Sequence, residues 1–167
     1  MTTRSGLERW FPEKIGQFGT LTIFDLLIKY INDGRIKLDR SRYDGAAAYH
    51  DPCNYCRKGE KIFGYGYYDE PRYILDLCHP NRVDLYPDRS HQFCCGGGGG
   101  ALTSGYNKER IYYGRKKMSQ IKAAGANMVV VSCHSCHAQL NSIKKEFGMD
   151  ELEVKYLWET VAECLVL

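Results

Sequence analysis

The stretch NMVVVSCHSCHAQL, residues 127–140, decides the fold class of this chain. Its MVVV segment is apolar and rich in β-branched residues, which is typical of a buried strand. The segment HSCHAQLNSIKKEFG follows and predicts a helix over 134–147 that ends at Gly148. Cys133 and Cys136 lie at the junction, about one helical turn apart. We therefore expect a strand that leads into a helix, with two thiols at the carboxyl end of the strand.

The pattern of a strand followed by a helix recurs along the chain. A helix is predicted from near Asn107 to Gly125, and LEVKYL predicts a strand before the helix WETVAECLVL. The elements predicted upstream are a helix within 22–34, a strand at 46–50, a helix entered at Glu70-Pro71 and a strand at 82–88. Strands that alternate with helices form parallel sheets covered on both sides. We expect an α/β fold, with a parallel sheet flanked by helices on both faces.

The chain is long enough for one domain with a substantial core. It has 167 residues, of which 44% are hydrophobic, and it contains no internal repeat. We expect residues 1–44 to form a helical lead-in and residues 45–167 to form a cysteine-rich domain, which carries all eight cysteines.

Charge and hydropathy exclude several classes of partner. The net charge is +3 and the basic residues are scattered, so nucleic acid is not an expected partner. No apolar run approaches the roughly 18 residues of a membrane span, and the start lacks the apolar region of a secretory signal. We expect a cytoplasmic protein without a transmembrane segment of its own, and attachment to the periphery of a membrane complex stays open. In that compartment, eight cysteines indicate metal or redox chemistry more than disulfides.

Three groups of cysteines follow predicted strands, with the spacing C-x40-C-C-x37-C-x2-C. Cys53 follows the strand at 46–50, and Cys133 and Cys136 follow the strand in the opening stretch. Cys94 and Cys95 follow SHQF (90–93), a short segment that we expect to be extended. Ligands collect at the carboxyl ends of strands in such sheets, so these five thiols are expected to meet there. Five thiolates exceed the needs of one zinc ion, whereas an iron–sulfur cluster can use adjacent thiolates on different irons.

Five glycines follow the cysteine pair, in CCGGGGG at 94–100. One interpretation is a flexible linker. The other is that Gly96 and Gly97 let the backbone pass close to a metal centre and direct N–H groups toward it and toward an anionic substrate. The position between a cysteine pair and a helix favours the second interpretation.

Three motifs together resemble the cysteine-rich CCG domain of the B and D subunits of heterodisulfide reductase and their relatives. They are HDPC at 50–53, CCGGGGG at 94–100 and SCHSCHAQL at 132–140. EPRYIL, the helix after the glycines and the lead-in ERWFPEK are most similar to the C-terminal part of D-type subunits, a group that includes the K subunit of the sulfite-reductase-linked membrane complex. The resemblance is clear from Ala46 to Leu140.

The resemblance implies a cofactor and a reaction. Cys53, Cys94, Cys95, Cys133 and Cys136 match the cysteines that hold a 4Fe–4S cluster, cubane or non-cubane, at which disulfides or trisulfides are reduced. The substrate would then react beside Cys53, Cys94 and Cys95, and Gly96 and Gly97 would contact the cofactor.

The same resemblance implies partners and leaves two alternatives. Electrons would come from iron–sulfur or membrane cytochrome subunits, and the substrate could be carried by a small sulfur-carrier protein. One alternative is a zinc-stabilised module without catalytic activity that docks such a carrier, because some family copies hold zinc. The other is a subunit that only transfers electrons.

Two features depart from the family pattern. HDPCNYCRKG contains the additional Cys56, which we interpret as an alternative ligand, a resolving thiol or a spectator. D-type subunits also carry a ferredoxin section, and often a second CCG copy, which this sequence lacks. Electrons would therefore have to enter from a partner.

Several residues near the motifs have two interpretations. His50, His134 and His137 could donate protons to a leaving thiolate, with His134 the preferred candidate, or they could form outer hydrogen bonds. Arg57 and Lys58 could attract an anionic substrate or simply be solvated.

Other side chains have weaker links to the expected site. The tyrosines of IFGYGYYDEPRY could line a cleft or pack under a loop. Cys78 and Cys164 are expected in the core, because free cysteine packs like a small hydrophobe. His79 and His91 stay unassigned.

Overall fold

The computed structural model describes residues 2–166. Its α-helices are α1 (Thr2–Trp10), α2 (Ile23–Asn32), α3 (Arg57–Phe63), α4 (Asp69–Cys78), α5 (Asn107–Ala123), α6 (His134–Ile143) and α7 (Leu157–Glu163). Its strands are β1 (Ala47–Tyr49), β2 (Arg82–Val83), β3 (Met128–Val131) and β4 (Glu153–Tyr156). Short 3-10 helices are η1 (Ile15–Gln17), η2 (Arg40–Arg42), η3 (Arg89–His91) and η4 (Lys144–Phe147).

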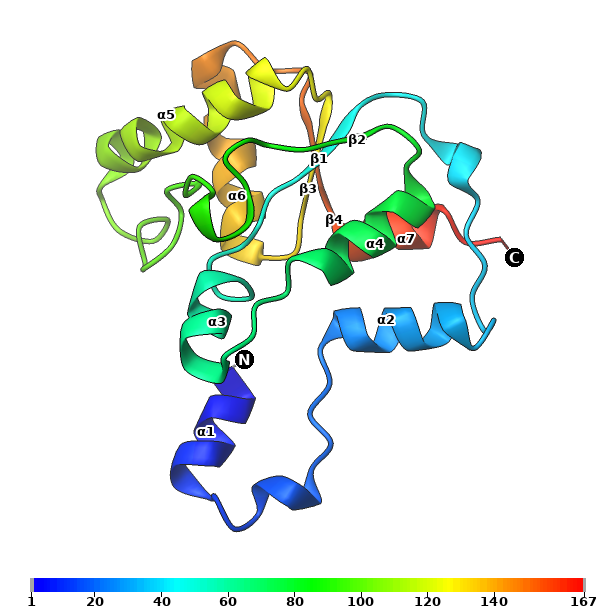
Figure 1. Cartoon of the computed structure of the whole chain (residues 1–167). Helices are drawn as coiled ribbons and strands as arrows, with labels where there is room; N and C mark the ends of the chain where they lie inside the picture. The colour runs from blue at the N-terminus through cyan, green and yellow to red at the C-terminus, as the bar shows by residue number, and fades with distance from the viewer. Residues whose placement is uncertain (1, 167) are drawn as a thin grey trace.

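The four strands form one parallel sheet in the order β2-β1-β3-β4 (Figure 1). The central strand β3 is buried throughout and pairs with β1 on one side and β4 on the other. An apolar run without alternation is what a strand buried on both faces requires. The predicted parallel α/β fold is confirmed.

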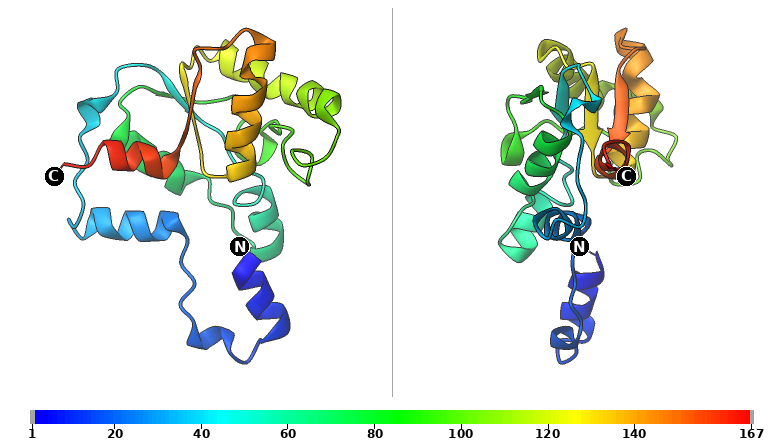
Figure 2. Two further views of the ribbon diagram at one scale, coloured as in Figure 1. Left: turned by 180° about the vertical axis from the view of Figure 1, so that it is seen from behind. Right: turned by 90° about the vertical axis from the view of Figure 1, so that its right-hand side faces the viewer.

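Alternate residues of the strands supply two separate layers of core. Ala48, Val129 and Val131 face the layer formed with α5 and α6. Ala47, Tyr49, Met128 and Val130 face the layer formed with α4 and α7, on which α2 packs. Figure 2 shows helices on both sides of the sheet. The carboxyl ends of β1 and β3 emerge between these layers, and this edge positions the site.

Helix α2 covers the second layer and begins at a capping box. The Thr22 hydroxyl accepts a hydrogen bond from the Asp25 N–H, and the Asp25 carboxylate accepts one from the Thr22 N–H. Phe24 then enters the core completely. Before this point, α1 and η1 project away from the sheet as an arm with few contacts to the rest of the chain (Figures 1 and 2). The proposed division at residues 44 and 45 stays a prediction.

Several predicted boundaries are wrong for physical reasons. The strand expected at 82–88 is limited to β2, because the pairing with β1 ends at Val83 and the segment then bends at Tyr86 and Pro87. Residues 90–93 are not an extended strand: η3 and a loop precede the cysteine pair instead. The helix predicted over 134–147 consists of α6 and then η4, which ends at Gly148 in a left-handed conformation.

Two further differences concern helices. The sequence reasoning missed α3, which begins directly after Cys56 and has only seven residues. The last helix is also shorter than expected and ends at Glu163. Within residues 2–166, no helix combines the length and the apolar character needed to cross a membrane.

Candidate metal centre

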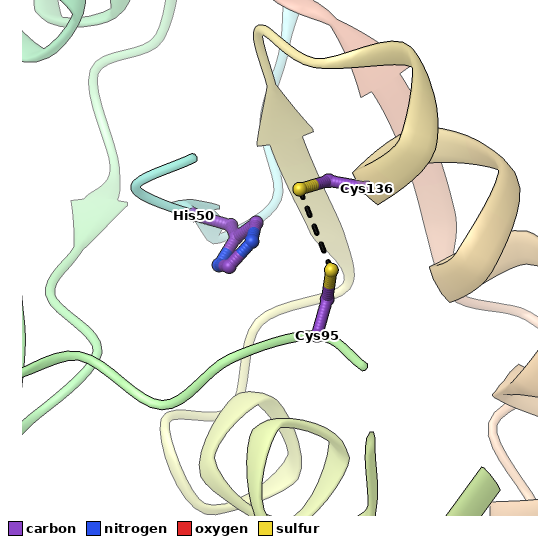
Figure 3. A group of neighbouring side chains, drawn as sticks. All are labelled: His50, Cys95 and Cys136. Carbon is purple, nitrogen blue, oxygen red and sulfur yellow. Dashed lines mark hydrogen bonds between the residues drawn. The ribbon is translucent and has the colours of Figure 1, made fainter. Parts of the chain in front are cut away.

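Five thiols from three segments converge at the carboxyl edge of the sheet. The Sγ atoms of Cys95 and Cys136 are 3.4 Å apart (Figure 3). The Cys94 thiol lies close enough to Cys53 and to Cys95 to shift their pKa values, and Cys136 acts on Cys133 in the same way. The contacts therefore run without a break from the loop after β1, through the cysteine pair, to the start of α6.

The thiols differ in their access to solvent. Cys95 and Cys136 are buried, Cys53 and Cys133 are half-buried, and Cys94 is exposed. One end of the group therefore belongs to the core, and the other end opens to the surface at Cys94.

Proton sharing between these thiols separates their pKa values. Hydrogen bonds from Cys136 and Cys94 lower the pKa of Cys95 to about 4. A hydrogen bond from Cys136 lowers the pKa of Cys133 to about 6, and the pKa of Cys136 is raised because its thiol serves both neighbours. The hydrogen bond with Cys94 raises the pKa of Cys53. The group thus favours thiolates that are surrounded by thiol donors.

His50 lies against the buried end of the thiols (Figure 3). One ring nitrogen of His50 and the Sγ atoms of Cys95 and Cys136 lie within 4.8 Å of one another. The imidazole is fully buried, and neither nitrogen has a hydrogen-bond partner among the described residues. Burial holds its pKa well below the usual value, so the ring is neutral. A buried imidazole without partners indicates that a further group binds beside it.

Asp51 fixes the loop that carries Cys53. Both of its carboxylate oxygens bind the Arg72 guanidinium, at 2.6 and 2.9 Å, and one also accepts the Arg89 N–H at 2.9 Å. Its backbone carbonyl accepts a hydrogen bond from Gln92. These bonds tie the loop after β1 to α4 and to the segment that precedes the cysteine pair. The two segments that carry Cys53 and the cysteine pair are thereby held in a fixed relative position.

Gly96 and Gly97 permit a close approach of the cysteine pair to α5 and α6. A Cβ on Gly96 would lie 2.7 Å from the Arg110 carbonyl oxygen, and its φ of 88° is left-handed. A Cβ on Gly97 would lie 2.5 Å from the Gln139 Cβ. The N–H of Gly96 donates to the Cys94 sulfur at 3.3 Å, and the N–H of Gly97 donates to Cys95.

The later glycines have no such packing role. Positions 98, 99 and 100 have free space around them, although Gly99 and Gly100 adopt positive φ angles in a turn. The close approach of the backbone is therefore a property of Gly96 and Gly97, whereas positions 98–100 form a turn.

Arg57 is oriented toward the thiols and Cys56 is not. The Arg57 guanidinium donates to the Cys53 sulfur and to the Gln92 carbonyl, both at 3.2 Å. The Cys56 thiol is buried and donates to the Tyr67 carbonyl at 3.2 Å, and burial raises its pKa. Lys58 instead lines a cavity between α1 and α3. The geometry gives Cys56 a packing position at the start of α3.

The other two candidate histidines lie on the outer side of α6. His134 is exposed, and its Nδ1 is 2.6 Å from the Tyr156 hydroxyl. The His137 ring stacks on Tyr156 with centroids 4.1 Å apart, and Tyr156 stacks on Trp158. His134 as a proton donor stays a prediction, and its hydrogen-bonding partner is a tyrosine that the sequence did not single out.

The remaining candidates pack in the protein. Cys78 and Cys164 are buried at the ends of α4 and α7, and His79 stacks on Tyr43. His91 lies exposed in η3. Tyr65 and Tyr67 form an edge-to-face pair beside Phe24 and line a cavity near α1, and the Tyr68 hydroxyl donates to Glu60.

A cavity of about 650 Å³ opens beside the exposed thiol. Its lining includes Phe93, Cys94, Tyr113, Arg115 and Lys116, with no acidic side chain. Arg115 stacks on the Tyr112 ring at 3.5 Å, and neither Arg115 nor Lys116 forms an ion pair within residues 2–166. Two unpaired cations thus border the most accessible thiol.

The donor set fits an iron–sulfur cluster. Five thiols are too many for one tetrahedral ion, whereas adjacent cysteines can serve different irons of a cluster. Backbone N–H groups, a guanidinium and a neutral imidazole line the same space, and such groups are the hydrogen-bond donors that tune clusters.

Comparison with known proteins agrees with this geometry. Residues 47–141 match the family model described as CCG, cysteine-rich domain, and the chain belongs to this family. The resemblance stated from the motifs is confirmed.

Three relatives illustrate where such domains occur. An Hdr-like menaquinol oxidoreductase iron-sulfur subunit of Archaeoglobus profundus is 30% identical over 91% of this chain and 27% of its own length. A probable membrane-anchored ferredoxin of Chromohalobacter salexigens is 32% identical over 81% of this chain and 19% of its own. A ferredoxin/F420H2-dependent CoB-CoM heterodisulfide reductase subunit of Methanosarcina acetivorans is 26% identical over 89% and 50%. The chain spans about a quarter of the first relative and half of the last.

Proposed function

We propose that this chain holds an iron–sulfur cluster on Cys53, Cys94, Cys95, Cys133 and Cys136 and acts as a disulfide-reducing module of a larger redox complex. The observation that carries the proposal is the continuous contact of five thiols drawn from three separate segments. A packing role would not require thiols at all five positions, because apolar side chains would fill the same space.

The names of the relatives support a redox role over a purely structural one. Two of the relatives are described as an iron-sulfur subunit and as a subunit of a heterodisulfide reductase. Because this chain spans only part of each, its electron donors are proposed to lie in other domains or subunits, iron–sulfur or cytochrome in type. The membrane-anchored relative supports a location at the periphery of a membrane complex.

The reaction needs a site that delivers two electrons to the disulfide. Cleavage of R–S–S–R′ to RSH and R′SH consumes two electrons and two protons. When bound, an iron–sulfur cluster supplies single electrons and an iron that can bind sulfur. The residues of the chain do the remaining work.

The chain places the substrate and shields the site. Cys94 marks the accessible side, and the cavity beside it has room for one substituent of the disulfide. Arg115 and Lys116 attract an anionic group there, and Arg57 directs positive charge to the sulfur of Cys53. Cys95, Cys136 and His50 close the inner side against water.

The second candidate function is a zinc-stabilised module that does not catalyse. The specific observation in its favour is the group of His50, Cys95 and Cys136, which offers one imidazole and two thiolates at metal-binding separation. Docking of a sulfur-carrier protein would then be the remaining role. A subunit that only transfers electrons would differ from the disulfide-reducing module in one respect, because it would bind no substrate at Cys94.

One experiment separates these candidates. The protein is purified without oxygen, reconstituted with iron and sulfide, and titrated with a disulfide while the visible spectrum is recorded. Catalysis predicts about four irons per chain and a spectral change on addition of the disulfide. A single zinc without sulfide supports the docking module. A cluster that ignores the disulfide supports electron transfer alone.

A further inference from the structure

Lys117 of α5 is a fully buried cation without an ionic partner. Its exposed fraction is 0%, and its Nζ donates a hydrogen bond of 2.6 Å to the Gln120 side chain. Gln120 is in turn fixed by a hydrogen bond to the Pro87 carbonyl. No carboxylate lies within ion-pair distance of Lys117 in the part of the chain that the structure describes. Buried lysines are rare unless they are paired, so this one requires an explanation.

The surroundings of Lys117 suggest where its counter-charge is. The charged groups that act on it are Asp51 and the thiols of Cys95, Cys136 and Cys94. Asp51 is already neutralised by the two-point contact with Arg72. Only the thiols remain without a compensating buried cation.

Helix α5 gives Lys117 a fixed position. It packs on α6 through Gly114, whose missing side chain lets the helix approach the Cys95 carbonyl oxygen. Arg110 and Gln139 lock the two helices together by reciprocal hydrogen bonds. Lys117 lies about one turn after Gly114 and is buried with it, on the side of the helix where Gly114 meets the Cys95 carbonyl oxygen.

Burial opposes the positive charge of the lysine. Burial lowers the pKa of Lys117 to about 8, and the nearby thiols and Asp51 oppose that effect. If this position only had to be filled, Met has a similar length and would fill it without the cost of burying a charge.

We propose that Lys117 is the built-in counter-cation of the thiolate centre, which stabilises the negative charge of the loaded site and raises its reduction potential. This inference rests on the proposed function in one respect, since it assumes that the five thiols hold a metal centre. It does not assume that the centre reduces a disulfide. Lys117 acts through the electric field it places on the ligands and touches no substrate, so it is a positioning residue.

The test compares Lys117→Met with Lys122→Met. Both changes remove one positive charge from α5, but Lys122 is exposed near the end of the helix. In metal-free protein, urea unfolding of the two variants measures the structural part of the effect, which includes a buried Gln120 side chain left without its donor. A loss of metal retention in Lys117→Met that is no larger than its loss of metal-free stability would show a purely structural role and would overturn the proposal.

The loaded protein should show the larger effect, because the metal centre concentrates negative charge on the thiolates. Lys117→Met should lower the equilibrium constant for one-electron reduction at least tenfold, which is about 59 mV in the midpoint potential. It should also lose metal to a chelator at least tenfold faster, while Lys117→Arg should retain most of both properties. The inference would be refuted if Lys117→Met left the midpoint potential and the metal retention unchanged. It would also be refuted if Lys122→Met shifted both by the same amount.

The inference and the proposed function can fail separately. Chelator competition is also run with zinc alone, so the charge of Lys117 is tested even where no iron–sulfur cluster assembles. A cluster whose potential depends on Lys117 but that ignores disulfides leaves the inference standing and removes the reductase function.

Discussion

The close packing of Gly97 against α6 leads to a sharp prediction about the glycine run. In Gly97→Ala, the new Cβ would meet the Gln139 Cβ at 2.5 Å and the Ser135 carbonyl oxygen at 2.8 Å. Neither atom is the end of a flexible side chain, so the loop and α6 must separate. Cys95 and Cys136 lie on these two segments, and their 3.4 Å contact would lengthen.

The matched control is Gly98→Ala. A Cβ at position 98 has no atom within 4 Å, and neither Gly97 nor Gly98 has a positive φ. Both substitutions reduce the freedom of the unfolded chain in the same way, which stabilises the folded state by about 0.4–1 kcal/mol. The two variants therefore differ only in the packing of one methyl group.

The expected change in the free energy of unfolding follows from the overpacking cost and the entropy gain. Overpacking costs about 1–3 kcal/mol, so Gly97→Ala should lose about 0–2.6 kcal/mol after the entropy gain is subtracted, with a central value of about 1.3 kcal/mol. With a urea slope of about 2 kcal/mol/M, its unfolding midpoint should fall by about 0.5–1 M. Gly98→Ala should unfold at the same or a slightly higher concentration.

Urea unfolding of the metal-free variants measures the packing cost, and iron content after anaerobic reconstitution measures its effect on the site. We expect Gly97→Ala to retain much less iron than Gly98→Ala. Equal midpoints and equal iron content in the two variants would refute the argument that the first glycines set the approach of the cysteine pair to α6.

Three further outcomes are expected. Arg72→Met should destabilise the chain by about 3–5 kcal/mol in urea unfolding, because the buried Asp51 carboxylate loses its partner, and unchanged stability would contradict this. Arg57→Met should leave metal-free stability within about 0.5 kcal/mol but lower the reduction potential of the loaded protein, because it removes a donor to Cys53. Arg115→Met should raise KM for dithiodipropionate several-fold and leave KM for the neutral hydroxyethyl disulfide unchanged, and equal effects on both would exclude anion binding in the cavity.

The sequence predicts the parts of this molecule that depend on local pattern. The β-branched run gives β3, the apolar spacing gives α2, and Gly125 and Gly148 end helices as expected. Cys133 and Cys136 are placed by the same local rule, since they follow β3 directly.

The remaining features depend on contacts between distant segments. The cysteine pair follows η3 and a loop, so its place beside α6 comes from Gly96, Gly97 and the fixed position of Asp51, not from a preceding strand. The sequence around Lys117 does not distinguish it from its basic neighbours Arg115 and Lys116, which line the cavity at the surface. Burial of one lysine among several is a property of how α5 packs.

The central claim is that five thiols jointly hold one iron–sulfur cluster. Its most direct test is iron and sulfide analysis of the anaerobically reconstituted chain, beside single Cys→Ser variants at the five motif positions and at Cys78 as the control. The account predicts about four irons with a similar amount of sulfide in the unaltered chain and in Cys78→Ser, and a marked loss in each motif variant. Full iron content in the motif variants, or one zinc without sulfide in the unaltered chain, would contradict it.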